Sequence, residues 1–170
     1  NLRNRPVTKK RLLELLQKFY AGVEDITTQT QGNTIQVFFH ETGLREPVPA
    51  TRLSDGTLRY LCLLTIFCHP TPPPLICLEE PELGIHPDLL PTIVELLQEC
   101  AERTQLIVTT HSEVIVSVLT DMPDAIIVCE KNSELGTQLK RLTTGELEDW
   151  LKKYSLGQLW SKGAIGGNRW

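Results

Sequence analysis

Two short apolar segments in the middle of the chain constrain its fold most strongly. Residues 75–78 read LICL and residues 106–109 read LIVT, and neither segment alternates apolar with polar side chains. A strand without a polar face is typical of a parallel sheet that is covered on both faces. Residues 87–103, between the two segments, have apolar side chains at helical spacing. The order strand, helix, strand therefore predicts an α/β fold with a mostly parallel sheet flanked by helices.

Further elements extend this pattern in both directions. An N-terminal helix and a β-hairpin with a Gly-Asn turn should lead into the central region. We expect helices over residues 6–21, 57–68, 113–119 and 145–154, and strands over residues 23–31, 33–40, 125–129 and 137–142. The strand over residues 125–129 should join the parallel sheet. We expect a single domain in which residues 1–52 are the lead-in, residues 53–130 the core, and residues 131–170 a C-terminal part with an irregular tail.

Composition excludes several classes of protein. Of the 170 residues, 41% are hydrophobic and 22% are charged, as in ordinary globular domains. Wholesale disorder, a collagen-like repeat and a disulfide mini-scaffold are therefore excluded. The net charge of −4 leaves no global electrostatic footprint for nucleic acid. Residues 1–20 nevertheless carry six Lys or Arg and one Glu, which indicates either a polyanion contact or a solvated helix face.

The five cysteines predict reduced thiols rather than disulfides. Their number is odd, no pair has CxxC spacing, and most lie in apolar runs, where we expect them to act as small core side chains. This usage is typical of a reducing compartment, so we expect a cytoplasmic protein. The alternative is a zinc site formed by Cys62, Cys68, His69 and Cys77. The longest nearly apolar run, residues 60–68, is far below the ~20 residues of a membrane-spanning helix, so no membrane association is expected.

Two adjacent carboxylates, Glu79 and Glu80, follow the strand at residues 75–78 and precede a proline. In open α/β sheets, ligands bind at the carboxyl ends of the strands. One carboxylate could hold Mg²⁺ through its water shell, because Mg²⁺ prefers oxygen ligands and keeps several waters. The other could orient and polarise an attacking water. A polar strand end that simply faces solvent is the alternative interpretation.

A helix start and a second strand end supply two further candidate sites. Ser54 can cap the helix that follows the LSDG segment, and Gly56 lets the backbone approach a ligand closely. The free N–H groups and the dipole of such a helix start attract anions. His111 follows the strand at residues 106–109 and can donate a hydrogen bond to a phosphate oxygen or to a water. An ordinary helix cap and a histidine satisfied at a strand end are the alternatives.

The order and spacing of these motifs resemble the head of ABC-type ATPases. LSDGTLR, LICLEEPELGIHP and QLIVTTHS follow one another as the signature, Walker B and switch-histidine motifs do in that family. The chain looks most like the branch that contains SMC, RecF and OLD-like ATPases. The specific motifs cover residues 53–130, and the resemblance implies the C-terminal half of a P-loop NTPase fold.

The LSDG segment is similar to the signature motif of this family. The resemblance implies that Ser54, Asp55 and Gly56 contact the γ-phosphate of an ATP that is held by the opposing head of a dimer. Transporter subunits usually have glycine and glutamine where this chain has Asp55 and Thr57. These departures favour the soluble branch over a transporter subunit.

The resemblance also implies roles for the residues around the second motif. Glu79 takes the Mg²⁺-side position of Walker B, and Glu80 takes the position of the water-polarising glutamate. His111 matches the switch histidine. His86 occupies the position at which many members have the D-loop aspartate, so that role is open here. The implied reaction is Mg²⁺-dependent hydrolysis of ATP.

A Walker A loop, GxxxxGK[ST], is absent from the chain, because none of its eleven glycines is followed by lysine. The chain starts at Asn1 and its single methionine is Met122, so we expect a processed chain or a piece of a longer protein. The nucleotide-cradling half is then expected upstream, and this chain alone should bind ATP poorly. The expected partners are ATP, Mg²⁺, the missing Walker A half and a second head in a homodimer, with DNA left open.

Two other functions are open at this point. The chain could be a non-catalytic interaction or dimerisation module that completes a partner ATPase half, because half a head leaves a sheet edge and apolar surface to be covered. The side chains that could serve such contacts, or pack in the core and tail, are Trp150, Trp160 and Trp170. The third hypothesis is a metal-dependent nuclease. Its metal-binding residues would be Glu79, Glu80, Glu82 and His86.

Overall fold

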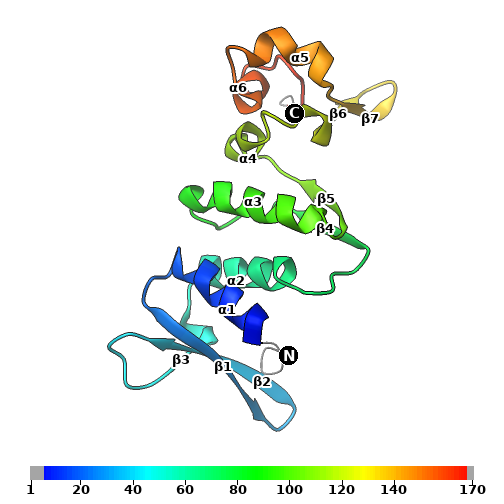
Figure 1. Ribbon diagram of the computed structural model, residues 1–170. Helices are drawn as coiled ribbons and strands as arrows, with labels where there is room; N and C mark the ends of the chain where they lie inside the picture. Colours follow the sequence, from blue (N-terminus) through cyan, green and yellow to red (C-terminus); the bar gives the residue numbers. More distant parts are fainter. Residues whose placement is uncertain (1–5, 168–170) are drawn as a thin grey trace. The chain divides into compact units, whose positions relative to one another are not determined.

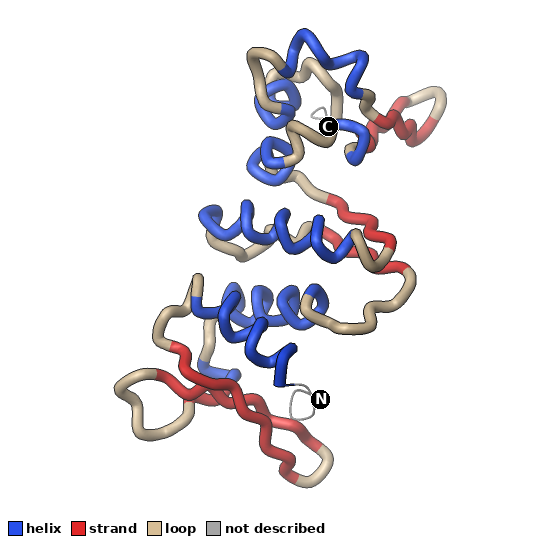
Figure 2. Tube along the Cα trace, viewed as in Figure 1, coloured by secondary structure: helices blue, strands red, loops and turns tan. Residues whose placement is uncertain are grey.

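The computed structural model describes residues 6–167 and divides them between two units (Figure 1). The first unit takes in the residues up to 89 together with residues 95–109. The second unit takes in residues 90–94 and the residues from 110 onward. Helices and strands occur in both units (Figure 2).

The first unit contains an antiparallel sheet of three strands. Strand β1 (Val23–Gln31) pairs with β2 (Thr34–Glu41), and the two-residue strand β3 (Val48–Pro49) pairs with the other edge of β2. The hairpin turn begins at Gly32, whose φ of 57° lies in the left-handed region that glycine adopts without penalty. The predicted hairpin is therefore confirmed, with its turn at the Gly-Asn pair.

Two helices, α1 (Pro6–Gln17) and α2 (Asp55–Phe67), pack against each other, and α1 also packs against β1 (Figure 1). Their buried side chains are Leu12, Leu15, Leu16, Thr57, Tyr60, Leu63, Leu64 and Phe67. The Tyr60 hydroxyl donates a hydrogen bond to the carbonyl oxygen of Leu15 at 3.3 Å, which links the two helices. Helix α1 is shorter than predicted, and turns follow it, in which the N–H groups of Phe19 and Tyr20 both donate to the carbonyl oxygen of Leu16.

Strands β4 (Leu75–Glu79) and β5 (Gln105–Thr109) form a parallel pair. This confirms the parallel pairing that the two apolar segments predict. Along both strands the side chains alternate between a covered face and an exposed face, on which Leu75 is 45% and Ile107 is 52% exposed. The expectation that both faces are covered is therefore wrong for the described residues. A parallel sheet with a bare apolar face needs a further layer to bury it.

The segment between β4 and β5 forms the 3-10 turn η3 (Pro87–Leu89) and the helix α3 (Leu90–Ala101), as its spacing predicts. The buried side chains of α3 recur at helical intervals and are Leu90, Ile93, Val94, Leu96 and Cys100. Parallel strands need a long crossover connection, usually a helix, and α3 supplies it between β4 and β5.

All five cysteines are free thiols. Cys100 is a buried core side chain, whereas Cys62, Cys77 and Cys129 are exposed. The expected role as core side chains is therefore wrong for these three thiols. No helix within residues 6–167 is long and apolar enough to cross a bilayer.

In the second unit, β6 (Ile127–Asn132) and β7 (Gly136–Arg141) form an antiparallel hairpin. The strand expected at residues 125–129 therefore pairs with its neighbour in the sequence rather than with β4 or β5. The reason is that Val128 is the one buried residue of β6, so this strand lacks the two dry faces of a central parallel strand.

Three helices complete the second unit: α4 (Glu113–Val118), α5 (Thr144–Leu151) and α6 (Leu156–Ser161). Its buried core consists of Val116, Val128, Leu142, Leu147, Leu156 and Leu159. Helix α6 lies in the tail that was expected to be irregular, and a capping box between Ser155 and Gln158 begins it. Short 3-10 turns elsewhere in the chain are η2 (Ala50–Arg52) and η4 (Pro123–Ala125).

The tryptophans have different surroundings. Trp160 packs against the core of the second unit, whereas Trp150 is 53% exposed. Trp170 lies outside the described residues. Core packing, one of the two roles expected for these side chains, therefore describes Trp160.

Candidate functional site

The two carboxylates that follow LICL lie where β4 leaves the sheet. Glu79 is the last residue of β4, is exposed, and pairs in register with Thr109 of β5. The N–H of Glu80 donates to the carbonyl oxygen of Thr109 at 2.9 Å, which extends the ladder by one residue. The chain then turns, since the N–H of Leu83 donates to the carbonyl oxygen of Glu80 at 3.1 Å. Both carboxylates are thus carried at the carboxyl end of a parallel strand pair.

Glu80 has a backbone conformation that a residue with a side chain rarely adopts. Its φ of +43° is the one positive φ of a non-glycine residue within residues 6–167. Pro81 follows directly, and the residue before a proline is restricted further. Such a conformation costs about 1–3 kcal/mol and persists only where surrounding contacts impose it. Because strained residues gather at functional sites, the backbone singles out Glu80 among the acidic residues.

The LSDG segment and the turn after Glu80 are in direct contact. A Cβ atom added to Gly56 would overlap the carbonyl oxygen of Gly84, so the two backbones meet here. Gly84 has a φ of 72°, and Arg59 of α2 donates from Nη1 to the carbonyl oxygen of Leu83 at 3.1 Å. The structure thus brings two of the three motifs together within one unit. Sequence reasoning missed Gly84 and Arg59, although a glycine so soon after the carboxylates indicates a turn.

Ser54 caps α2 at its N-terminus. Its Oγ accepts a hydrogen bond from the N–H of Thr57 at 3.2 Å and lies 2.8 Å from the Thr57 hydroxyl. The N–H groups of Asp55 and Gly56, in the first turn, have no partner within the helix. These donors and the positive end of the helix dipole attract an anion, while the exposed Asp55 carboxylate offsets part of that charge. The contact with Gly84 gives Gly56 a structural reason to be glycine, besides the expected approach of a ligand.

His86 has a structural partner at the start of the next helical segment. Its Nδ1 accepts a hydrogen bond from the N–H of Asp88 at 3.3 Å, and its carbonyl oxygen accepts one from the N–H of Leu89 at 2.9 Å. The His86 side chain is 62% exposed. These bonds begin η3, so the structure supplies a helix-start role for His86, and the D-loop role stays a prediction.

His111 is exposed and follows β5 in the chain. Only Thr110 separates it from Thr109, whose carbonyl oxygen accepts the N–H of Glu80. His111 belongs to the second unit, and Glu79 and Glu80 belong to the first. Glu79 and Glu80 are therefore carried by the end of β4 and the turn after it, and His111 by the loop that follows β5 in the chain.

A cluster of metal ligands is not part of this arrangement. No group of three or more His, Cys, Asp or Glu side chains in the described part of the chain is placed to hold a metal ion. The zinc hypothesis thus has no support from Cys62, Cys68, His69 and Cys77. The nuclease hypothesis has none from Glu79, Glu80, Glu82 and His86. A Mg²⁺ ion that one carboxylate holds through water does not need such a cluster.

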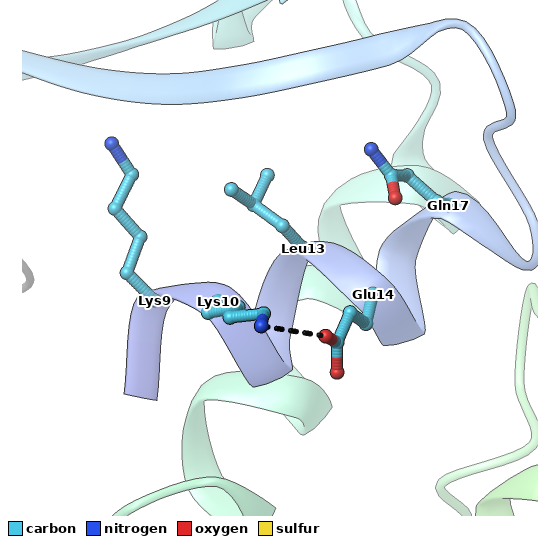
Figure 3. Close-up of a pocket in the computed structure, with 5 residues that line it drawn as sticks. All are labelled: Lys9, Lys10, Leu13, Glu14 and Gln17. Carbon is cyan, nitrogen blue, oxygen red and sulfur yellow. Dashed lines mark ion pairs between the residues drawn. The ribbon is translucent and has the colours of Figure 1, made fainter. Parts of the chain in front are cut away.

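A hollow of about 460 Å³ lies on α1, and none of its lining residues belongs to the three motifs. It is lined by Lys9, Lys10, Leu13, Glu14 and Gln17 (Figure 3). Lys10 forms an ion pair with Glu14, and Lys9 and Arg11 pair with other acidic side chains of the same unit. The three basic residues of α1 therefore have acidic partners within the chain, which favours a solvated helix face for them, while Arg3 and Arg5 lie outside the described residues.

The fold and the site together define a class of protein. A parallel strand pair ends in two carboxylates, and the turn that follows contacts the capped start of α2, which buries one face and exposes Asp55, Arg59, Cys62 and Thr65. The family model and the fold shared with solved SMC heads support a P-loop ATPase-type domain, as the resemblance in the motifs implies. The chain belongs to the family whose model, described as "AAA domain, putative AbiEii toxin, Type IV TA system", matches residues 1–117. No curated protein sequence matches the chain.

Solved structures of SMC heads share the fold. One, from work on ATP-driven dimerisation and DNA-stimulated activation of SMC ATPases, matches with a TM-score of 0.59 and 14% identity over 89% of this chain and 93% of that one. The Smc head domain with a coiled coil and joint from Pyrococcus yayanosii matches with a TM-score of 0.64 and 17% identity over 89% of this chain and 30% of that one.

A third similar structure is the Smc head domain of Pyrococcus furiosus with an extended coiled coil, bound to the C-terminal domain of ScpA. It matches with a TM-score of 0.66 and 14% identity over 89% of this chain and 38% of that one. At these identities the likeness shows the fold alone. The chain spans nearly all of the first structure but well under half of each Pyrococcus chain.

Proposed function

We propose that the chain carries the hydrolytic half of an ATPase head, which cleaves ATP with Mg²⁺ at an interface between two heads. The family and the fold are those of ATPases. The observation that carries the finer proposal is the contact between Gly56 and Gly84, which keeps the LSDG helix start beside the turn after Glu80. That contact would couple the LSDG segment, which would touch the ATP of the opposing head, to Glu80, which would act on the ATP of its own head.

The carboxylates at the end of β4 suit a Mg²⁺–ATP complex. Glu79 is exposed, and a carboxylate oxygen is the kind of ligand that Mg²⁺ prefers while it keeps several waters. When bound, Mg²⁺ would neutralise charge on the phosphate oxygens. Glu79 would hold the ion through water, and Glu80 would orient and polarise the attacking water. His111 would donate a hydrogen bond to the γ-phosphate or to that water.

The opposing head would supply Ser54, Asp55 and Gly56. These residues form the start of α2, where two backbone N–H groups have no helical partner and can donate to a γ-phosphate. ATP-driven dimerisation is described for the SMC ATPases whose structure shares this fold. That description supports a homodimer of heads as the active form.

The phosphate-cradling loop would come from outside residues 1–170, because no glycine in them is followed by lysine. The bare face of β4 and β5, with Leu75 and Ile107 exposed, supports a partner layer, since parallel sheets are covered on both faces. Residues 1–170 alone would then bind ATP poorly.

Replacement of Glu80 by glutamine tests the proposal. Glutamine keeps the size of the side chain but cannot accept a proton from water. In the intact protein we expect Glu80→Gln to keep ATP affinity and to lower turnover by about 10²–10⁴-fold. Calorimetry measures the affinity, and phosphate release measures turnover. The matched control is Glu134→Gln, because Glu134 is an exposed acid in the turn between β6 and β7. Unchanged turnover in Glu80→Gln would contradict the proposal.

A non-catalytic module is the second candidate, and the bare face of β4 and β5 favours it as well. In that case the chain would complete a partner's ATPase half without acting on the water. The same assay separates the two candidates. A module predicts that the assembled ATPase has equal turnover with wild-type chain and with Glu80→Gln, whereas the hydrolytic half predicts loss.

A further inference from the structure

We propose that helix α6 (Leu156–Ser161) positions His111, with Gly157 and Ser161 as positioning residues. The inference rests on the proposed function, because it concerns the histidine that would contact the γ-phosphate or the attacking water. All of the residues that carry it belong to the second unit. Helix α6 lies beyond residues 1–117, which the family model matches.

The start of α4 (Glu113–Val118) determines the path of the backbone at His111. Ser112 caps α4, since its Oγ accepts a hydrogen bond from the N–H of Ile115 at 3.3 Å. On the other side, the N–H of Ser112 donates to Oγ1 of Thr110 at 3.0 Å. These bonds flank His111 and tie its backbone to the first turn of α4.

Helix α4 cannot hold this position by itself. It has six residues, far below the roughly 12–15 at which an isolated helix is marginally stable. Its stability must therefore come from packing, and Ile115 and Val116 are its buried side chains. The helix that packs against it is α6 (Figure 1).

The approach of α6 to α4 leaves no room for a side chain at Gly157. A Cβ atom there would overlap the carbonyl oxygen of Glu113 and Oγ of Ser117, and would lie 2.9 Å from Cγ of Glu113. The Glu113 carbonyl group belongs to the first turn of α4, two residues after His111. A change at Gly157 would therefore displace the backbone that carries His111.

Hydrogen bonds fix α4 to α6 at both ends of α4. At the N-terminal end, Oγ of Ser161 donates to Oε2 of Glu113 at 2.6 Å. At the C-terminal end, the N–H of Leu156 donates to Oγ1 of Thr120 at 3.1 Å. These two bonds oppose both rotation and sliding of α4, so the orientation of His111 depends on α6.

Gly157→Ala and Ser161→Ala test this dependence in the intact protein. The first substitution forces α6 away from Glu113, and the second removes one exposed hydrogen bond and leaves the core unchanged. We expect kcat to fall by about 10- to 100-fold in Gly157→Ala and by less in Ser161→Ala, with an unchanged KM for ATP. Two control variants should behave as wild type. In Gly145→Ala the added Cβ meets nothing within 4 Å, and Ser161→Thr keeps the hydroxyl.

An NMR measurement separates this inference from the proposed function. The imidazole resonances of His111, assigned with His111→Gln, should shift in Gly157→Ala and Ser161→Ala, while those of the other three histidines of residues 1–170 stay in place. This result is expected whether or not the protein hydrolyses ATP, so a wild type without turnover would contradict the proposed function alone. If Gly157→Ala does not fold, Ser161→Ala decides. Unshifted His111 resonances in Ser161→Ala, or equal shifts for all four histidines, would overturn the inference.

Discussion

At the scale of single residues, the backbone of Glu80 connects structure to chemistry most closely. Glu80 has a positive φ directly before Pro81, and this backbone conformation is unfavourable by about 1–3 kcal/mol. The hydrogen bond to Thr109 on one side and the turn closed by Leu83 on the other side impose this conformation. A residue held in this way presents its side chain in one direction, as a water-orienting group requires.

Glycine at position 80 should relieve strain that alanine retains. We expect Glu80→Gly to be more stable than Glu80→Ala by about 1 kcal/mol, because the left-handed region penalises only a residue with a Cβ atom. Urea unfolding of the two variants measures the difference. An alanine variant that is at least as stable as the glycine variant would show that position 80 is not strained.

Asp25 gives the first unit a pH-dependent contribution to stability. Burial raises its pKa, but hydrogen bonds from Lys9 and from the N–H of Ile26 outweigh burial, and the pKa lies below its usual value of 3.8. The ionised carboxylate therefore stabilises the fold fully above that usual value. The contribution is lost as the pH falls through the lower folded-state pKa.

Asp25→Asn tests this contribution. We expect it to lower the free energy of unfolding by at most about 1 kcal/mol near neutral pH, because the pair with Lys9 is partly exposed. In acid, below the folded-state pKa, the variant and the wild type should become equally stable. Denaturant titrations across the acidic range measure the difference, and a difference that does not change with pH would contradict the assignment.

At the scale of elements, the contact between two glycines joins α2 to the turn after β4. Gly56→Ala would place a Cβ on the carbonyl oxygen of Gly84, so we expect a loss of about 1–3 kcal/mol in the free energy of unfolding and a fall in turnover. Gly145→Ala in α5, where the added Cβ meets open space, should be neutral or slightly stabilising. Equal stability of the two variants, measured by denaturant unfolding, would contradict the close contact.

The sequence predicted those elements whose signals are local. The apolar runs of β4 and β5 and the Gly-Asn turn of the first hairpin specify structure within a few residues. The partner of β6 was mispredicted, because strand pairing depends on long-range packing and one apolar run does not select a sheet. Helix α6 was missed because six residues show little periodicity, although Ser155 and Gln158 have the spacing of a capping box.

In the candidate site, too, the sequence predicted local features and missed those that depend on distant parts of the chain. Glu79, Glu80 and His111 could be proposed because polar residues at the ends of apolar strands stand out in a sequence. The contact of Gly56 with Gly84 could not be predicted, since no local rule pairs residues so far apart in the chain. The positive φ of Glu80 was equally hidden, because it arises from the sheet and the turn on either side.

At the scale of the whole molecule, the chain combines an ATPase family and fold with two features that our proposal explains by a partner layer. It has no Walker A loop, and one face of its parallel sheet is bare. A further layer that carries the phosphate-binding loop and covers Leu75 and Ile107 would account for both features.

ATP turnover in a mixture of two inactive variants tests the central claim most directly. In a head–head dimer, Ser54 would act on the ATP of the opposing head and Glu80 on the ATP of its own head. Ser54→Arg and Glu80→Gln should each lack turnover alone, but a mixed dimer keeps one intact site. Random pairing makes half of the dimers mixed, so we predict phosphate release at about one quarter of the wild-type rate. Mixed dimers that form, as shown by cross-linking, but release no phosphate would contradict the account.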